Sequence, residues 1–158
     1  MKAYRRTSTS AFTLVEILIV VIILGILAAI VIPQFTNAST DARRNSTSSL
    51  LQTIRSQVEL FKLQHRDRFP LVDLDDITTA WDWDKLTTKT DEDGVAGGAL
   101  GPYMQQIPVN PLNSNTAVDS VAADPAVGAA AAAGSGYVFS QATGKVFATD
   151  KDGNVTAD

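Results

Sequence analysis

The chain has 158 residues, of which 45% are hydrophobic and 19% are charged, and its formal net charge at pH 7 is −4. This composition fits one small domain with a membrane helix and excludes a wholly disordered chain. The absence of cysteine excludes a disulfide framework and a thiolate metal site. The excess of acid argues against a phosphate-binding surface built on clustered Lys and Arg, so no nucleic-acid partner is expected.

Residues 1–11 have the composition of a short targeting leader. They include Lys2, Arg5 and Arg6 and no acidic residue, and the remainder is mainly Ser, Thr and Ala. Positive charge before an apolar segment favours a cytoplasmic N-terminus. Removal of this leader takes away three of the 13 Lys and Arg residues and none of the 17 Asp and Glu residues, so the remaining chain is more acidic.

The segment 12–33 is predicted to be a membrane-spanning helix. The 21 residues from Phe12 to Ile32 are apolar apart from Thr13 and Glu16. At 1.5 Å per residue they would span about 31 Å as a helix, which matches the hydrocarbon core of a bilayer. A secretory signal would have a shorter apolar core followed by a small-residue cleavage site, so we expect this segment to be retained.

Glu16 is the one charged residue in this segment. A carboxylate at the centre of a membrane helix costs roughly 2.5–3.5 kcal/mol on insertion scales, so a partner or a function is expected to compensate it. The nearest candidate partner is an α-amine freed at Phe12, which would be protonated at neutral pH and lies one helical turn away. The alternative is a tolerated acid at the membrane edge that reaches water.

Two residues weaken the predicted helix. Pro33 has no backbone donor and clashes with the carbonyl of the residue four positions before it, which predicts a kink near Ala29. Gly25 is a second weak point. The kink is either a fixed feature without a functional role or part of a segment that loses its helix during assembly.

The N-terminal motif resembles the class III signal of type IV pilins and type II secretion pseudopilins. It consists of Arg5-Arg6, then Ala11-Phe12-Thr13-Leu14-Val15-Glu16, then the apolar run with Gly25 and Pro33. The resemblance implies that a prepilin peptidase cuts between Ala11 and Phe12 and that the new amine of Phe12 is methylated. The family usually has Gly before the cut, where this chain has Ala11.

The resemblance also implies how subunits assemble. Glu16 of one subunit would pair with the Phe12 amine of the next as the helix leaves the bilayer. The helix between Gly25 and Pro33 would be lost in the filament. The expected fold is α+β and pilin-like, with a long kinked N-terminal helix packed against a small C-terminal antiparallel β-sheet.

Residues 34–66 are predicted to form an amphipathic spine helix that continues the membrane helix. Its apolar positions recur at spacings of three and four, namely Leu50 or Leu51, Ile54, Val58 and Phe61. Residues 36–49 are expected to form a polar neck between the membrane and the head. Within it, Arg43 and Arg44 are expected to be solvated; the alternative is pairing with acidic groups of a neighbouring subunit or with lipid phosphate. The chain's single histidine, His65, has charged neighbours and is expected to be exposed.

Residues 67–158 are predicted to form the globular head, which starts as Arg68-Phe69-Pro70 ends the helix. Trp81 and Trp83 are expected to cover the spine helix. The proline-rich stretch 101–112 resembles the "GPY…IP.NP" segment of G-type pseudopilins. The segment 137–149 predicts a β-hairpin with Gly144 at a positive φ, and Val155 is a candidate for a third antiparallel strand.

Asp150, Asp152 and Asn154 alternate as in a calcium loop, and the resemblance implies calcium near the C-terminus of major pseudopilins. The pattern is only a fragment of the twelve-residue motif, because Gly153 is displaced and the terminal Glu is missing. We therefore predict a solvated turn and no cofactor, with Asp150 and Asp152 as the weak calcium candidates.

The sequence offers no basis for an enzyme, because it has no nucleophile elbow, phosphate loop or His/Glu metal spacing. The function expected from the resemblance is a structural subunit of a periplasmic pseudopilus in type II secretion. The alternatives are a type IV pilin of a surface pilus, for adhesion, motility or DNA uptake, and a signal-anchored membrane enzyme. Expected partners are copies of itself, minor pseudopilins, the prepilin peptidase, the inner-membrane assembly platform and membrane lipid. The expected location is the bacterial inner membrane, single-pass, with a periplasmic head and assembly into a filament.

Overall fold

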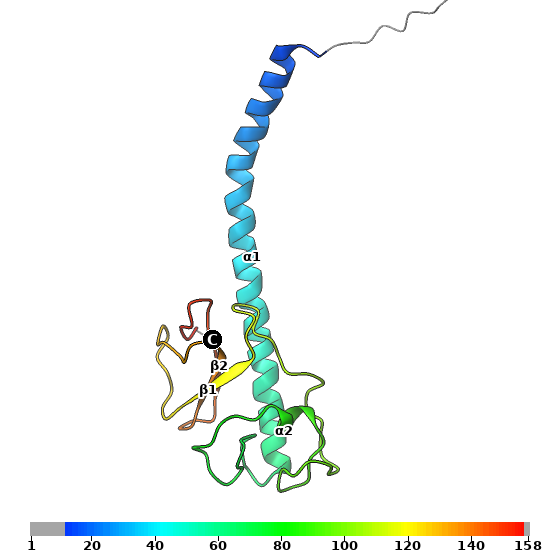
Figure 1. Cartoon of the computed structure of the whole chain (residues 1–158), viewed down its shortest axis with the longest axis vertical. Coiled ribbons are helices and arrows are strands. Elements are labelled where there is room, and N and C mark those ends of the chain that lie inside the picture. Colours follow the sequence, from blue (N-terminus) through cyan, green and yellow to red (C-terminus); the bar gives the residue numbers. More distant parts are fainter. Residues whose placement is uncertain (1–11, 157–158) are drawn as a thin grey trace, which may run out of the picture. The chain divides into compact units, whose positions relative to one another are not determined.

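The computed structural model of the chain describes residues 12–156, so the predicted leader, residues 1–11, lies outside the described residues. The elements follow the order α1 (Leu14–Gln64), α2 (Asp84–Thr87), β1 (Ala117–Val121), β2 (Ser135–Ser140) and β3 (Val146–Ala148) (Figure 1). A long N-terminal helix followed by a small sheet is the α+β, pilin-like architecture expected from the sequence, and that prediction is confirmed.

The chain divides into two compact units, Met1–Asp41 and Ala42–Asp158. Their boundary falls inside α1. The reason is the apolar stripe on the C-terminal part of the helix, which makes this part of α1 a component of the head's core. Its buried residues are Thr47, Leu51, Ile54, Val58 and Phe61.

This stripe confirms the spacing predicted for the spine helix. Leu51, Ile54, Val58 and Phe61 are each at most 2% exposed. Full burial of a large apolar side chain contributes roughly 1.5–3 kcal/mol. The stripe therefore supplies much of the stability of a head whose sheet has only three short strands.

The sheet differs from the predicted one because it is mixed and not purely antiparallel. The predicted hairpin is confirmed, since β2 pairs with β3 in the antiparallel direction. On its other side, however, β2 pairs with β1 in the parallel direction. A parallel pair requires a crossover connection of a dozen or more residues, which the segment 122–134 provides. Val155 forms a single antiparallel bridge with Thr149 and no full third strand.

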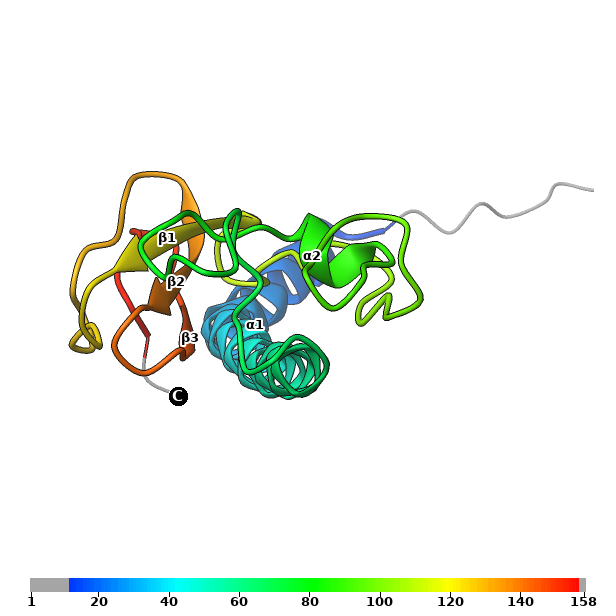
Figure 2. The ribbon, with the colours of Figure 1, turned by 90° about the horizontal axis from the view of Figure 1, so that it is seen from below.

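In Figure 2 the strands lie to the left of the C-terminal half of α1 and α2 lies above it, on an adjacent side of this helix. Arg55 of α1 fastens the edge strand β3 by donating two hydrogen bonds, of 3.0 and 2.7 Å, to the carbonyl of Val146. The same guanidinium lies 5.7 Å from the centre of the Phe147 ring. The edge of the sheet is thereby covered by a charged side chain, which protects it from pairing with another chain.

The two tryptophans are buried, but they pack on the sheet and on each other. Their rings meet edge to face with 5.3 Å between centroids. Trp81 lies 5.1 Å from Phe139, and Trp83 lies 5.8 Å from Tyr137. The prediction that they cover the spine helix is therefore incomplete, because their ring partners belong to β2. The paired aromatic rings form the layer that joins the loop 70–83 to the sheet.

Replacing Gly144 with Ala should destabilise the head more than the same change at Gly153. Both glycines have a positive φ, +71° and +81°. An added Cβ at Gly144 overlaps the ring of Phe69, whereas nothing lies within 4 Å at Gly153. We expect a loss of about 2–4 kcal/mol for Gly144→Ala, from backbone strain plus overpacking, and about 1–2 kcal/mol for Gly153→Ala, from strain alone. Urea unfolding of the full chain in detergent, followed by tryptophan fluorescence, measures both; equal losses would contradict the packing account.

Candidate functional site

The start of α1 is a reciprocal cap formed by Thr13 and Glu16. The Thr13 backbone N–H and hydroxyl both donate to Oε2 of Glu16, at 2.9 and 2.8 Å. In return, the Glu16 backbone N–H reaches the Thr13 hydroxyl oxygen at 3.3 Å. The Thr13 carbonyl accepts the first helical bond, from Ile17, at 3.4 Å. This is the capping box of a T-x-x-E sequence, and it fixes where the helix begins.

The cap uses only one of the two oxygens of the Glu16 carboxylate. Both bonds from Thr13 end on Oε2, and within residues 12–156 no hydrogen bond or ion pair is formed by Oε1. A carboxylate has about four acceptor positions, so Oε1 is open to a donor from outside the chain. Phe12 lies just before the cap and is 78% exposed. Ala11, the residue on the other side of the predicted cleavage site, lies outside the described residues.

The N-terminal part of α1 is long and apolar enough to cross a membrane. An 18-residue window of this helix reaches a mean hydropathy of 3.3, and none of that window is buried within the chain. The large apolar side chains of the segment 14–32 are all more than 40% exposed. A helix that is apolar on every side and uncovered by its own chain requires an apolar environment, so it provides a membrane anchor.

The helix α1 continues through Gly25 and Pro33 without a break. Pro33 removes only the one bond that Ala29 would accept, and the bonds on either side hold the helix. The hydroxyl of Thr36 donates to the carbonyl of Ile32 at 3.2 Å, next to the proline. Loss of helix in a filament stays a prediction.

In the neck, the two arginines have different surroundings. Arg43 donates to the carbonyl of Pro111 at 3.0 Å and so joins α1 to the proline-rich loop. Arg44 is exposed on the helix surface. Both arginines are exposed, as predicted, and Arg43 in addition bonds the loop 108–116, which passes within reach of its side chain.

His65 is fully buried, which corrects the expectation that it is exposed. Its ring stacks on Phe61 at a centroid distance of 3.7 Å. Nδ1 lies 2.9 Å from the Phe61 carbonyl, and Nε2 lies 2.9 Å from the Thr90 hydroxyl. Because a carbonyl only accepts, the proton is placed on Nδ1, and Nε2 accepts from Thr90. The position four residues after Phe61 continues the apolar stripe, and this periodicity outweighs the charged neighbours.

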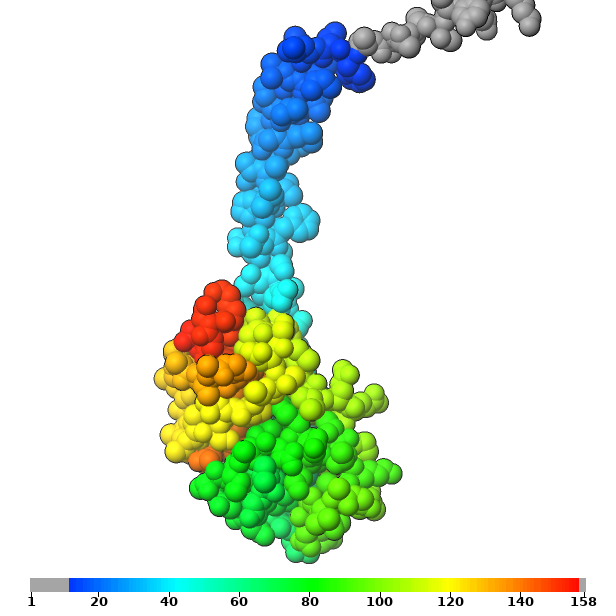
Figure 3. All heavy atoms as spheres, viewed as in Figure 1, coloured from blue at the N-terminus to red at the C-terminus, as the bar shows by residue number. Residues whose placement is uncertain are grey.

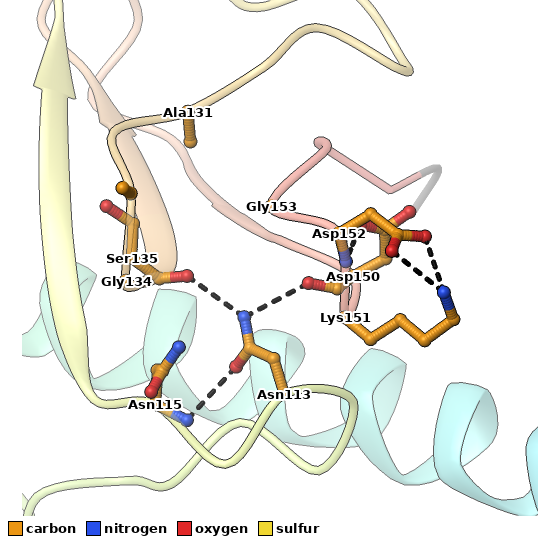
Figure 4. Close-up of a pocket in the computed structure, with 10 residues that line it drawn as sticks. Asn113, Asn115, Ala131, Gly134, Ser135, Asp150, Lys151, Asp152 and Gly153 are labelled. Atoms are coloured by element: carbon orange, nitrogen blue, oxygen red, sulfur yellow. Dashed lines mark hydrogen bonds and ion pairs between the residues drawn. The ribbon is translucent and has the colours of Figure 1, made fainter.

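A polar pocket lies between the C-terminal turn, residues 150–154, and the loop 110–116 (Figure 4). Its lining includes both weak calcium candidates, Asp150 and Asp152, together with Asn113 and Asn115. Asp150 accepts the backbone N–H groups of Asn154, at 2.8 Å, and of Asp152, at 2.9 Å, through Oδ1. These bonds, the one from Asn154 foremost, lower the pKa of Asp150 below its ordinary value. The Asp152 carboxylate pairs with its neighbour Lys151 at 2.7 Å.

Asn113 joins three segments at this pocket. Its Nδ2 lies 2.8 Å from the Thr149 hydroxyl, 2.9 Å from the Ser135 carbonyl and 3.2 Å from the Asp150 carbonyl. Its Oδ1 accepts the backbone N–H of Asn115 at 3.0 Å, which fixes the orientation of the amide. The role of Asn113 could not be predicted from the sequence, since neither periodicity nor a motif distinguishes it from an ordinary loop asparagine.

Thr13 was also missed as a functional residue, although the T-x-x-E spacing could have predicted its cap. In the described residues, no group of three or more His, Cys, Asp or Glu side chains is placed to hold a metal ion.

Comparisons with known proteins point to the start of α1. A family model described as the prokaryotic N-terminal methylation motif matches residues 6–32. Proteins named type II secretion system core protein G are similar to the chain. That of Pseudomonas aeruginosa is 38% identical over 61 residues, which cover 39% of this chain and 43% of the relative. That of Klebsiella michiganensis is 36% identical over 66 residues, 42% of this chain and 46% of the relative.

The protein of the same name from Aeromonas hydrophila is 29% identical over 103 residues, which cover 65% of this chain and 66% of that relative. The chain thus spans less than half the length of the first two relatives. No solved structure matches it significantly. The chain therefore carries a prokaryotic N-terminal methylation motif and is similar to core protein G of type II secretion systems over part of its length.

Proposed function

We propose that this chain is a structural subunit of a periplasmic pseudopilus in type II protein secretion, with no catalytic activity of its own. The single observation that carries the proposal is the start of α1. There, a methylation motif contains a carboxylate with one uncommitted oxygen, in a chain similar to core protein G. Such a group serves assembly, because it offers a charged contact to a neighbouring subunit.

Processing comes first in this proposal. A prepilin peptidase cuts between Ala11 and Phe12 and methylates the new amine of Phe12. The subunit is stored in the bacterial inner membrane with its N-terminus in the cytoplasm and its head in the periplasm. The basic residues of the leader, which precede the apolar helix, support this orientation.

Assembly then joins Glu16 of one subunit to the methylated amine of Phe12 on the next. Thr13 keeps Oε2 of Glu16 within its own helix, so the incoming amine binds Oε1. In an apolar setting each of these charges needs a partner, because an unpaired buried charge costs several kcal/mol. The pair thus stabilises a subunit only when it stands beside another. Partners include copies of this chain, minor pseudopilins, the inner-membrane assembly platform and membrane lipid.

The segment from Gly25 to Pro33 gives the helix a place to extend during this step. The Ala29 carbonyl has no helical donor because of Pro33, and Gly25 has no side chain to hold the helix. Loss of helix between them would lengthen the subunit in the filament. The support for this part of the proposal is the position of the two residues within an apolar helix.

Gene deletion in the host organism separates this function from that of a surface pilin. Under the proposal, exported proteins accumulate in the periplasm of the deletion strain, and the wild-type gene restores their secretion. The number of long surface fibres stays unchanged in electron micrographs. Normal secretion with a loss of surface fibres would contradict the proposal and favour a type IV pilin. Normal secretion together with normal fibres would contradict both the pseudopilus function and the surface-pilus function.

A further inference from the structure

Three oxygens gather where three segments of the head meet. They are the Ser135 carbonyl, at the start of β2, and the Thr149 hydroxyl and Asp150 carbonyl, from the residues directly after β3. In Figure 3 the C-terminal turn (red) lies against the orange and yellow segments of the head. Oxygens from separate segments at one junction repel each other unless a donor or a cation lies among them.

The donor set here does not fit the calcium ion that the pilin resemblance implies. Calcium takes about six to eight oxygen ligands. The group aimed at these oxygens is instead the amide nitrogen of Asn113, and its bond from Asn115 to Oδ1 prevents the amide from turning over. The carboxylate of Asp150 is committed through Oδ1 to two backbone N–H groups. That of Asp152 is held through both oxygens by Lys151.

We propose that the side-chain amide of Asn113 takes the place of a cation at this junction, so that the C-terminal turn is closed without calcium. Nδ2 of Asn113 contacts oxygens from two segments at 2.8–3.2 Å, as Figure 4 shows for Ser135 and Asp150. An amide supplies two N–H donors, and a third bond is made by the Thr149 hydroxyl to the Ser135 carbonyl at 2.6 Å. Together the Asn113 amide and the Thr149 hydroxyl supply the hydrogen bonds that these oxygens need, and they add no net charge.

A second amide supports the same junction. Asn110 is fully buried, and its Nδ2 donates to the carbonyls of Gly136 and Thr149 at 2.6 and 2.8 Å. Its Oδ1 accepts the backbone N–H of Leu112 at 2.9 Å. Asn110 and Asn113 thus join the loop that carries them to both β2 and the end of β3. The inference concerns the head alone and does not depend on the pseudopilus function.

Thermal unfolding of the full chain in detergent, followed by fluorescence of Trp81 and Trp83, tests the proposal on the unmodified protein. The melting temperature should be the same in EDTA and in millimolar calcium, to within the error of the measurement. A ligand that binds only the folded state raises the free energy of unfolding as its concentration increases, so a calcium site would be visible in this titration. A saturable rise of several degrees with calcium, absent with magnesium, would overturn the proposal.

Asn113→Asp, compared with Asn115→Asp, tests the position of the amide. The first change places a carboxylate among the oxygens, while the second adds the same charge to the same pocket outside the hydrogen bonds of Nδ2. In EDTA we expect Asn113→Asp to lower the melting temperature by roughly 5–10 °C and Asn115→Asp to change it little. Calcium should raise the melting temperature of Asn113→Asp only, because this variant now has an oxygen site.

Two results with the variants would contradict the inference. One is an Asn113→Asp protein that melts like the wild type in EDTA. The other is a melting temperature of Asn113→Asp that does not rise with calcium. That result would mean that Nδ2 of Asn113 does not occupy the position of a cation. If the variant fails to fold, the calcium titration of the wild-type chain decides the proposal by itself.

Discussion

Replacing Glu16 with Gln is expected to abolish filament assembly while the protein stays in the membrane and is still processed. Gln keeps an oxygen that can accept from Thr13, so the cap of α1 survives. The negative charge is lost, and the amine of the next subunit finds no partner. Removing one member of a buried ion pair costs about 3–5 kcal/mol, and about 1.4 kcal/mol already shifts an equilibrium tenfold.

The assay is the yield of filaments after shearing or crosslinking, normalised to the subunit present in the membrane. Glu16→Gln should lower this yield at least about tenfold. Thr13→Ser is the matched control, because it keeps the hydroxyl that bonds Oε2 of Glu16. It should assemble like the wild type. Normal filaments from Glu16→Gln would show that the carboxylate is only a tolerated acid at the membrane edge.

Replacing Phe139 with Ala should cause the largest loss of stability in the head. Phe139 lies in the central strand, is fully buried, and contacts the rings of Phe69 and Trp81 at 5.4 and 5.1 Å. Removing its ring leaves a cavity where the sheet and the loop 70–83 meet. Phe→Ala changes in cores cost about 3–5 kcal/mol, which is a large fraction of the roughly 5–15 kcal/mol that stabilises a typical domain.

Urea unfolding of the full chain in detergent measures this loss, and the nearby Trp81 reports it directly. Leu63→Ala is the control, because Leu63 lies at the C-terminal end of α1 with 83% of its surface exposed. It should change the free energy of unfolding by less than about 0.5 kcal/mol. Similar losses for both variants would contradict the assignment of the core.

The parts of the fold that follow from periodicity were predictable from the sequence. The apolar run gives α1 its membrane-spanning part, and the spacing of three and four gives its buried stripe. Alternation with a glycine turn gives the hairpin of β2 and β3. At the candidate site, the lone charge of Glu16 was evident because an acid in an apolar segment is costly.

The remaining features depend on tertiary contacts that no local pattern reveals. β1 contains Asp119 and Ser120 and is half-buried, so its sequence lacks the apolar alternation typical of a strand. It is a strand because it pairs with β2. Asn113 has its role only because two other segments bring oxygens to it. The burial of His65 did not follow from its charged neighbours, because Arg66 and Asp67 point outward while His65 continues the stripe inward.

The central claim is that this chain becomes a filament subunit through a processed N-terminus whose amine meets Glu16. Its most direct test is mass spectrometry of the protein purified from the membrane of its host. The account predicts a mature chain that begins at Phe12 with one methyl group on the amine. A membrane-bound chain that still begins at Met1, in cells with an active prepilin peptidase, would contradict it.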